Sequence, residues 1–372
     1  MKITDFKLER YFARHEFSSP YLLCCSDCET LTVEDVLQLE GEEARTKFMK
    51  LGLGYTESPG SKELRQQIAR IYDHMEVENI LVTAGAEEAI FIFMNTSLVS
   101  GDHVIVQFPY YQSLGEVARS IGCEVSYWDM EEAQGWAPDL ESLLHIIKPN
   151  TRAVIVNMPH NPTGYLCSRH GFTNLVGILR ERNILLFSDE VYRLLEYHDS
   201  DRLPAACDIY ENAVSLGVMS KAYGLAGLRI GWVASSNLKI IRKMAAFKDY
   251  TTICNSAPSE FLAAIALKHS ESVVRRNLDI IKHNLLLLDE FFVRYSDIFS
   301  WNRPKAGPIA FPSVEWPGGV DVFCSQLIAA RGVLLLPASC FGFGTRNLRI
   351  GFGRRDMPEA LEQLQSFLKT RQ

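Results

Sequence analysis

The stretch SLGVMSKAYGLAGLRIGW, residues 215–232, places Lys221 between an apolar run and a glycine-punctuated segment that leads to Arg229. Burial disfavours an ammonium group, so a lysine in such a place can carry an uncharged amine that attacks a carbonyl carbon. Arg229 can supply a bidentate cation for a bound phosphate. A surface lysine and an arginine in a structural ion pair would explain the same residues, and this stretch alone leaves both interpretations open.

On both sides of this stretch, short apolar runs alternate with helical patterns. Such alternation predicts an α/β fold with a large, mostly parallel sheet of about seven strands, covered by helices on both faces. In sheets of this kind the ligand binds at the carboxyl ends of the strands, where this chain carries polar clusters. The strands are expected at residues 80–83, 104–108, 123–127, 153–156, 184–187, 214–217 and 230–234, and helices at residues 86–96, 113–121 and 173–182.

The length of 372 residues favours two lobes over a single core. We expect an N-terminal segment at residues 1–50, which belongs to the small domain and the mouth of the site, and a large domain at residues 51–250. A smaller α+β domain would follow at residues 251–372. A long helix at residues 271–295 would link the two domains, because apolar residues recur along it with the helical period. Near the start of the chain, Thr32 is expected to cap a helix.

The overall composition argues against several classes of partner. A net charge of −7 is unsuited to nucleic acid, whose phosphates need a basic face. No run approaches about 18 apolar residues, so no membrane span is expected, and the mixed charges of the N-terminus do not resemble a signal peptide. Nine scattered cysteines are typical of reduced thiols and predict a cytoplasmic protein. No metal is expected, because the cluster of Cys24, Cys25 and Cys28 has no second ligand pair.

Two of the polar clusters suit a charged, planar ligand. NMPHNPTG, residues 157–164, forms a rigid turn after a strand, and the amide of Asn161 can donate to a ligand oxygen. SDEVY, residues 188–192, ends a buried strand on Asp189, whose carboxylate needs a cation or an N–H donor to stay ionised. A plain turn and a helix N-cap are the alternative explanations.

Two further clusters are weaker signals. In VTAGAEEAI, residues 82–90, the turn Gly85–Ala86–Glu87 begins a helix whose backbone N–H groups can hold an anion, although such turns often only cap a helix. Glu87 would have to face away from a phosphate, because its carboxylate would repel the anion. Tyr110 or Tyr111 can stack on a planar ligand, although tyrosines at strand ends more often pack between lobes.

Together, Lys221, Asn161, Asp189 and Arg229 supply an aldehyde anchor, a donor to a ring oxygen, an acid for a ring nitrogen and a phosphate clamp. These are the four groups that pyridoxal 5'-phosphate requires, so the sequence predicts this cofactor.

The chain also resembles the class I/II aminotransferases, which are fold-type I pyridoxal-phosphate enzymes, from about Leu51 to the C-terminus. This resemblance implies a homodimer with shared active sites and a small-molecule amino acid substrate. The matching motifs are Y-T-x-x-x-G-x-x-x-L-R at residues 55–65, T-x-G-x-x-x-A at 83–89, N-P-T-G at 161–164, D-E-V-Y at 189–192, S-K-A-Y-G-L-x-G-x-R-I-G-W at 220–232 and L-R-I-G-F at 348–352.

The resemblance implies a role for each matching residue near the cofactor ring. Lys221 would form the Schiff base with the cofactor and move the α-proton, and Asp189 would pair with the ring nitrogen. Asn161 and Tyr192 would hold the ring hydroxyl oxygen, and Tyr111 would stack on the ring.

The resemblance implies further roles at the phosphate and at the substrate. The phosphate would be held by Ser220, Arg229 and the Gly85–Ala86–Glu87 turn, and by Tyr55 from a neighbouring subunit. Arg349 would bind the α-carboxylate of the substrate.

Three features depart from the family pattern. Val218 stands where many relatives carry a hydroxyl residue for the phosphate, and Glu87 stands where Thr, Ser or Gln is common. YLLCCSDCETL, residues 21–31, replaces a glycine-containing segment and resembles the branch of capreomycidine synthase and related cyclases of hydroxylated arginine. Acidic side chains near the mouth of the site would suit a guanidinium, and the candidates are Glu9, Glu16 and Asp27.

The sequence therefore leaves three functional hypotheses. The first is an aminotransferase that acts on an α-amino acid through an external aldimine, with Lys221 as the base that removes the α-proton. The second is a cyclase or lyase of a hydroxylated arginine, which eliminates a substituent and closes a ring. The third is a regulator that binds the cofactor without turnover, which the presence of both Lys221 and Asp189 disfavours. One scaffold can host all of these, so the sequence does not fix the substrate side chain.

Overall fold

The largest sheet has its strands in the order β2-β8-β7-β6-β5-β3-β4 in the computed structural model, which describes residues 2–370. β8 runs antiparallel to both of its neighbours, and the other neighbouring pairs are parallel. The predicted mostly parallel sheet is confirmed. Its strands are β2 (Ile80–Thr83), β3 (His103–Phe108), β4 (Glu124–Asp129), β5 (Thr151–Asn157), β6 (Leu185–Asp189), β7 (Ala213–Val218) and β8 (Gly231–Ala234).

Helices cover both faces of this sheet, as the apolar character of its strands predicts. Along β5, Ala153 and Ile155 pack into one apolar cluster, whereas Val154 and Val156 pack into the other. This alternation follows from the period of two in a strand. Helices α5 (Ala86–Ser97), α6 (Ser113–Ile121) and α10 (Leu238–Lys248) belong to the first cluster, and α7 (Leu140–Ile146) and α8 (Arg169–Glu181) belong to the second.

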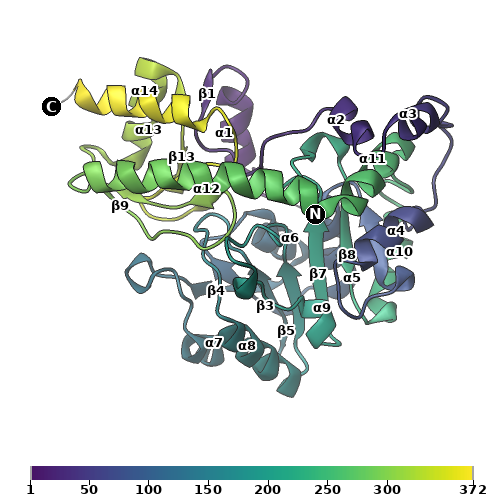
Figure 1. Cartoon of the computed structure of the whole chain (residues 1–372). Helices are drawn as coiled ribbons and strands as arrows, with labels where there is room; N and C mark the ends of the chain where they lie inside the picture. The colour runs from purple at the N-terminus through teal and green to yellow at the C-terminus, as the bar shows by residue number, and fades with distance from the viewer. Residues whose placement is uncertain (1, 371–372) are drawn as a thin grey trace.

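The 25-residue helix α12 (Ser270–Arg294) runs across the molecule between the main sheet and the C-terminal elements (Figure 1). It begins and ends within one residue of the helix expected from the sequence. Beyond it lie β9 (Phe299–Ser300), β10 (Ile309–Ala310), β11 (Ser313–Val314), α13 (Gly319–Arg331), β12 (Val333–Leu334), β13 (Leu336–Pro337), β14 (Leu348–Gly351) and α14 (Met357–Lys369).

The N-terminal residues lie against two different parts of the molecule. Helix α1 (Lys7–His15) and β1 (Tyr21–Leu22) lie beside the C-terminal elements, where β1 pairs in parallel with β12 (Figure 1). Helix α2 (Val33–Gln38) begins after the predicted cap Thr32, which forms a capping box with Asp35. The division into three parts at residues 50 and 250 stays a prediction. The remaining helices are α3 (Glu42–Met49), α4 (Lys62–Ala69), α9 (Ala206–Ile209) and α11 (Ala257–Lys268), with short 3₁₀ turns η1 (Val77–Asn79), η2 (Glu132–Gln134), η3 (Asp199–Asp201), η4 (Ala226–Leu228) and η5 (Ala338–Phe341).

Between β1 and α2, the segment of residues 24–29 crosses the molecule in contact with the backbone of three glycines. A Cβ atom added at Gly351 would lie 1.9 Å from the carbonyl oxygen of Cys25, and one at Gly353 would lie 2.4 Å from that of Asp27. A Cβ atom at Gly224 would lie 2.3 Å from the carbonyl oxygen of Glu29. Only glycine allows so close a backbone approach, so these positions hold the crossing segment in place.

The carboxyl ends of the parallel strands bring polar residues to one edge of the sheet. In the register of β5, β6 and β7, Asn157 lies opposite Asp189, which lies opposite Leu216. The chain continues from β7 through Ser220 to Lys221, so residues from three strand ends meet here. Among the described helices, none is long and apolar enough to cross a membrane.

Candidate active site

A cavity of about 340 Å³ lies at this edge of the sheet, between the strand ends, helix α1 and the crossing segment. Nearly all of the residues predicted from the sequence to form a site line it. They are Glu9, Glu16, Asp27, Ala86, Glu87, Tyr111, Asn161, Asp189, Tyr192, Ser220, Lys221, Arg229 and Arg349.

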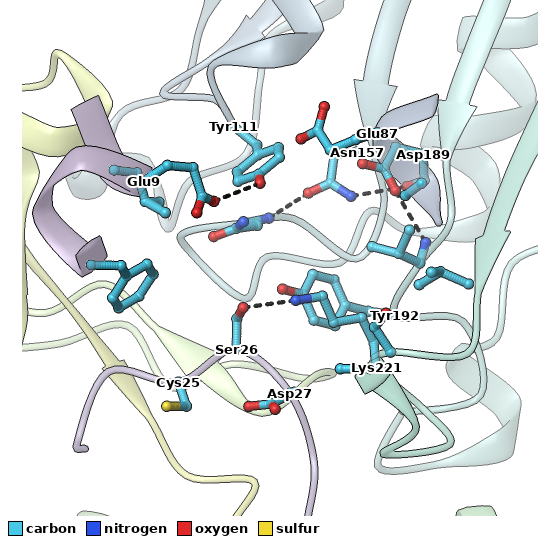
Figure 2. Close-up of a pocket in the computed structure, with 18 of the residues that line it drawn as sticks. Glu9, Cys25, Ser26, Asp27, Glu87, Tyr111, Asn157, Asp189, Tyr192 and Lys221 are labelled. Atoms are coloured by element: carbon cyan, nitrogen blue, oxygen red, sulfur yellow. Dashed lines mark hydrogen bonds between the residues drawn. The ribbon is translucent and has the colours of Figure 1, made fainter. Parts of the chain in front are cut away.

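Lys221 is half-buried, and its side chain points into the cavity. Its Nζ atom donates a hydrogen bond to Oγ of Ser26 at 2.8 Å and lies 5.8 Å from the ring centroid of Tyr192 (Figure 2). The hydroxyl of Tyr192 is buried in the cavity wall and has no hydrogen-bond partner among residues 2–370. A buried, unpaired hydroxyl is costly, which indicates that a ligand supplies the missing partner.

Asp189 is buried at the end of β6. Its Oδ1 atom accepts a hydrogen bond from the backbone N–H of Val191 at 3.1 Å. Burial raises the pKa of its carboxyl group to about 7, although that hydrogen bond and the charge of Lys221 act in the opposite direction. Asp189 is thus ready to pair with a cationic group in the cavity.

Asn157 holds the turn after β5 in place. Its Nδ2 group donates to the carbonyl oxygen of Asp189 at 2.9 Å, and its Oδ1 atom accepts from the backbone N–H of Asn161 at 2.6 Å (Figure 2). Asn161 accepts a bond from Nη1 of Arg349 at 3.1 Å through its Oδ1 atom. The Nδ2 group of Asn161 is therefore left to donate to a ligand oxygen, as the sequence predicts.

Arg349 is almost fully buried, with 1% of its surface exposed. Its Nε and Nη2 groups both donate to the carbonyl oxygen of Cys24, at 3.1 and 3.0 Å. A guanidinium has five N–H bonds, and these contacts together with Asn161 use three of them. One N–H remains on each of Nη1 and Nη2, which is the arrangement that grips a carboxylate with two parallel bonds.

Arg229 and the start of α5 form one end of the cavity, and Gly85 lies against the guanidinium from outside. A Cβ atom added at Gly85 would lie 2.5 Å from Nη2 of Arg229, so the guanidinium lies directly against the turn. Arg229 has a left-handed backbone with φ 52°, and its Nη1 group donates to the carbonyl oxygen of Ala226. In the described part of the chain Arg229 has no ion-pair partner. The alternative reading of this arginine as one half of a structural ion pair is therefore not supported.

Glu87 lines the cavity, whereas the sequence argument required it to face away from a phosphate. Its Oε1 atom accepts a hydrogen bond from Oγ of Ser113 on α6 at 3.1 Å, which holds the side chain at the cavity wall. Burial raises the pKa of this carboxyl group. Val218 also lines the cavity and offers no hydroxyl there.

The three acidic residues proposed for a guanidinium have different surroundings. Asp27 is paired with Arg354, whose Nη2 group lies 2.8 Å from its Oδ2 atom. Glu9 accepts a hydrogen bond from the hydroxyl of Tyr111 at 3.1 Å. Glu16, the residue directly after α1, lines the cavity, and burial raises the pKa of its carboxyl group.

Two predicted residues lie outside this cavity within the chain. Gly85 shapes it only through its contact with Arg229. Tyr55 is 91% exposed and lines a separate surface hollow with Asn255.

Several cavity residues were not predicted as site residues from the sequence, among them Ser26, Asn157, Phe12 and Arg354. Asn157 was within reach of sequence reasoning, because it begins the turn-rich stretch NMPHNPTG at a strand end. The other three carry no local signal.

Comparison with known proteins places this geometry in a family. Residues 20–364 match the family of class I and II aminotransferases. The chain belongs to this family. Its fold is that of a pyridoxal-phosphate-dependent aminotransferase from Streptococcus suis, with 32% identity, a TM-score of 0.94 and coverage of 100% of this chain and 99% of that one.

A capreomycidine synthase and a cyclase are also similar to this chain. The capreomycidine synthase of Streptomyces vinaceus is 29% identical over 353 residues, which cover 94% of this chain and 88% of the relative. The crystal structure of the pyridoxal-phosphate-dependent cyclase OrfR is 27% identical with a TM-score of 0.91, and covers 100% of this chain and 99% of that one. The chain is thus similar to an aminotransferase, a synthase and a cyclase at comparable identities of 32%, 29% and 27%.

Proposed function

We propose that this protein binds pyridoxal 5'-phosphate and acts on an α-amino acid, with transamination as its reaction. The observation that carries the proposal is the meeting of Lys221, Asp189 and Arg349 in one cavity. The three residues come from distant parts of the chain and offer an amine, a buried acid and a carboxylate grip. Membership in the class I and II aminotransferase family supports the same reaction.

The residues of the cavity fit the cofactor. The unpaired hydroxyl of Tyr192 and the Nδ2 group of Asn161 would hold the ring hydroxyl oxygen, and Tyr111 would cover the ring. Asp189 would face the ring nitrogen, whose positive charge would offset the cost of a buried carboxylate. Arg229, Ser220 and the N–H groups at the start of α5 would hold the phosphate.

When bound, the cofactor supplies an aldehyde for the amine and a ring that withdraws electrons from the α-carbon. Arg349 would hold the substrate carboxylate with its two free N–H bonds, which fixes the α-carbon near Nζ of Lys221. Lys221 would then remove the α-proton as general base and return it at a neighbouring carbon. Asp189, as a carboxylate, would keep the ring nitrogen protonated during this step.

The test is to mix the purified protein and pyridoxal phosphate with a panel of amino acids, with and without a keto acid. Transamination requires the keto acid for continued turnover and converts it to the matching amino acid. If no amine changed the spectrum of the bound cofactor, the protein would be a binding protein without turnover, and the proposal would be wrong.

A second candidate, cyclisation of a hydroxylated arginine, is favoured by one feature of the cavity. Glu16 lies in the wall formed by α1 and has no hydrogen bond or ion pair within 4 Å among residues 2–370, so it is free to accept a guanidinium. The similarity to capreomycidine synthase and to the cyclase OrfR supports this candidate.

Hydroxylated arginine tests it directly, because cyclisation releases water without any keto acid. Glu16→Gln should raise the KM for this substrate about tenfold and leave amino acids with neutral side chains unchanged. Glu43→Gln, on the exposed surface of α3, is the control. An equal effect of Glu16→Gln on neutral amino acids would remove the argument for a guanidinium.

We also propose a homodimer with shared active sites. Two side chains that line the surface hollow are strongly exposed, Leu53 at 81% and Tyr55 at 91%. Shortly before Cys254, which also lines the hollow, the chain exposes Tyr250 at 89% and Ile253 at 52%. Both polar atoms of the Asn255 side chain, in the same hollow, lack a partner among residues 2–370. A second copy that covers this surface would pair Asn255 and bring Tyr55 toward the neighbouring phosphate site. Sedimentation analysis tests this, since a monomer at micromolar concentration would contradict it.

All nine cysteines are free thiols, and the cytoplasmic location stays a prediction.

A further inference from the structure

The guanidinium of Arg349 lies over two phenylalanine rings that come from distant parts of the chain. Its central carbon, Cζ, is 6.0 Å from the ring centroid of Phe12 on α1 and 5.7 Å from that of Phe341 in η5. A cation over a ring and within about 6 Å of its centroid is attracted by the negative face of the ring. Arg349 therefore makes two cation–π contacts.

These contacts matter because the charge of Arg349 is buried without a carboxylate partner. The residue is 1% exposed and forms no salt bridge within 4 Å among residues 2–370. A buried charge is costly unless its neighbours stabilise it. Hydrogen bonds to Cys24 and Asn161 use three of the N–H bonds, which lie in the plane of the guanidinium. The faces of that plane carry no N–H bonds, and arginine stacks on aromatic rings through them.

The two rings differ in their position relative to the cavity. Phe341 is buried and does not line the cavity, and its ring meets that of Phe311 edge-on at 5.6 Å. Phe12 is half-buried and lines the cavity with Leu8, which lies four residues earlier on the same face of α1. Phe12 therefore contacts both the guanidinium and the space that a substrate would occupy.

Helix α1 is held on two sides, which gives the ring of Phe12 a defined position. The backbone N–H of Lys7 donates to Oε1 of Gln112 at 2.9 Å, just before α6. The hydroxyl of Tyr11 donates to the carbonyl oxygen of Leu335 at 3.2 Å, among the C-terminal elements. A side chain on an element anchored in this way can hold a neighbouring group in one geometry.

We propose that Phe12 is a positioning residue for the substrate carboxylate, and that it acts through its cation–π contact with Arg349. Together with Phe341 it stabilises the buried guanidinium, so that the two N–H bonds left free on Arg349 stay available in the cavity. The inference rests on the proposed function, because Arg349 is the residue that would grip the carboxylate. Loss of the ring weakens this grip and leaves the chemistry at Lys221 unchanged.

A ring that only filled space would act through its size. A cation–π contact acts instead through the electron density on the face of the ring. Fluorine atoms on the ring edge withdraw this density with little change in size, so the two explanations predict different results for a fluorinated ring.

The first experiment replaces Phe12 with trifluorophenylalanine and measures KM and kcat for the amino acid of lowest KM in the panel described above. KM should rise about tenfold, because the attraction between ring and cation is lost. The value of kcat should stay within about twofold of the wild type, since the contact is the same before and during the reaction. Phe12→Leu should resemble the fluorinated protein, and Phe12→Tyr should keep the wild-type KM. An unchanged KM with the fluorinated ring would overturn the inference and leave the proposed function intact.

Two controls make this measurement specific. The α-carboxamide of the same amino acid has no carboxylate, so its inhibition constant should be equal in all Phe12 variants. An equal loss for the carboxamide would overturn the inference. Trifluorophenylalanine in place of Phe247 is the matched control and should keep the wild-type KM. Phe247 is a half-buried residue of α10 whose ring contacts Phe91, and among residues 2–370 no cation lies over it.

The second experiment needs neither cofactor nor turnover. Denaturant titration gives the folding equilibrium constants of the wild type, Phe12→Leu, Arg349→Met and the double variant. Loss of the ring should lower this constant at least about twofold more beside Arg349 than beside a neutral methionine. Additive effects would overturn the cation–π contact. Turnover of no amino acid in the panel would instead overturn the proposed function, and the result of this cycle would still stand.

Discussion

The guanidinium of Arg349 donates from Nη1 to Oδ1 of Asn161 at 3.1 Å, across 188 positions of sequence. Asn161 is itself held by Asn157 at the end of β5, so Arg349 is braced against the rigid edge of the sheet. This bond joins the residue proposed to grip the substrate to the one proposed to hold the cofactor ring. A change in either should therefore affect both ligands.

We predict that Arg349→Lys raises the KM for the amino acid roughly 10- to 100-fold, because hydrogen bonds to charged groups contribute roughly 1.5–3 kcal/mol. Lysine keeps the charge but loses the planar pair of N–H bonds. Steady-state kinetics check this, with Asn161→Ala expected to weaken binding of both substrate and cofactor. An unchanged KM in Arg349→Lys would mean that another residue holds the carboxylate.

Lys221→Ala should lower kcat by at least about 1,000-fold, since the chain loses both the nucleophile and the base. Ser26→Ala should cost no more than about tenfold, because it removes only the hydrogen bond that orients Nζ of Lys221. Rapid-quench measurements of α-proton exchange distinguish the two effects. Full activity in Lys221→Ala would rule out the proposed reaction.

The raised pKa of Asp189 predicts that this residue lowers the stability of the cofactor-free protein at neutral pH while it supports cofactor binding. Its folded pKa of about 7 lies above the ordinary value of 3.8, so the native state without cofactor holds this proton more tightly than the unfolded chain does. The stability from this proton is full below pH 4 and is lost as the pH rises to about 7.

Asp189→Asn should therefore stabilise the cofactor-free protein at pH 8, by up to about 4 kcal/mol, with no gain at pH 4. It should also weaken cofactor binding, because a neutral amide cannot offset the ring cation. Denaturant titration at the two pH values checks the first point and dialysis the second. Equal stability of the two proteins at pH 8 would contradict the raised pKa.

Gly351→Ala should destabilise the fold by about 2–3 kcal/mol or more, because the added Cβ atom meets the backbone of Cys25, which cannot move aside as a side chain can. Gly177→Ala on α8 is the matched control, since nothing lies within 4 Å of its added Cβ atom. Helix propensity predicts that the control gains about 0.5–1 kcal/mol. If both variants changed the free energy of unfolding by a similar amount, residues 24–29 would be able to move away from the added Cβ atom at little cost.

Much of the fold could be predicted from the sequence because its signals are local. The helices at Ala86 and Ser113 begin where turn residues meet an apolar period, and the structure starts them at the same residues. The antiparallel direction of β8 could not be predicted from the sequence, because the alternation of residues along a strand is the same in parallel and antiparallel pairs.

In the site, too, residues with a local sequence signal could be predicted, whereas contacts between distant parts of the chain could not. Asp189 and Lys221 stand beside strand ends, so local pattern and family motif both indicate them. Ser26 meets Lys221 across 195 positions, and nothing in YLLCCSDCETL indicates that contact. The orientation of Glu87 depends on Ser113, a residue of another helix, so its placement in the cavity wall required the structure.

The three glycines that contact residues 24–29 also determine when this segment can reach its folded position during synthesis on the ribosome. The strand ends that carry Asp189 and Lys221 leave the ribosome well before Gly351 and Gly353, against which Cys25 and Asp27 must lie. Until those last residues emerge, residues 25 and 27 lack the glycine backbone that they contact in the folded chain, and we expect Ser26 not to be held beside Lys221. A ribosome stalled before residue 351 would therefore carry a nascent chain with a completed sheet and no working site.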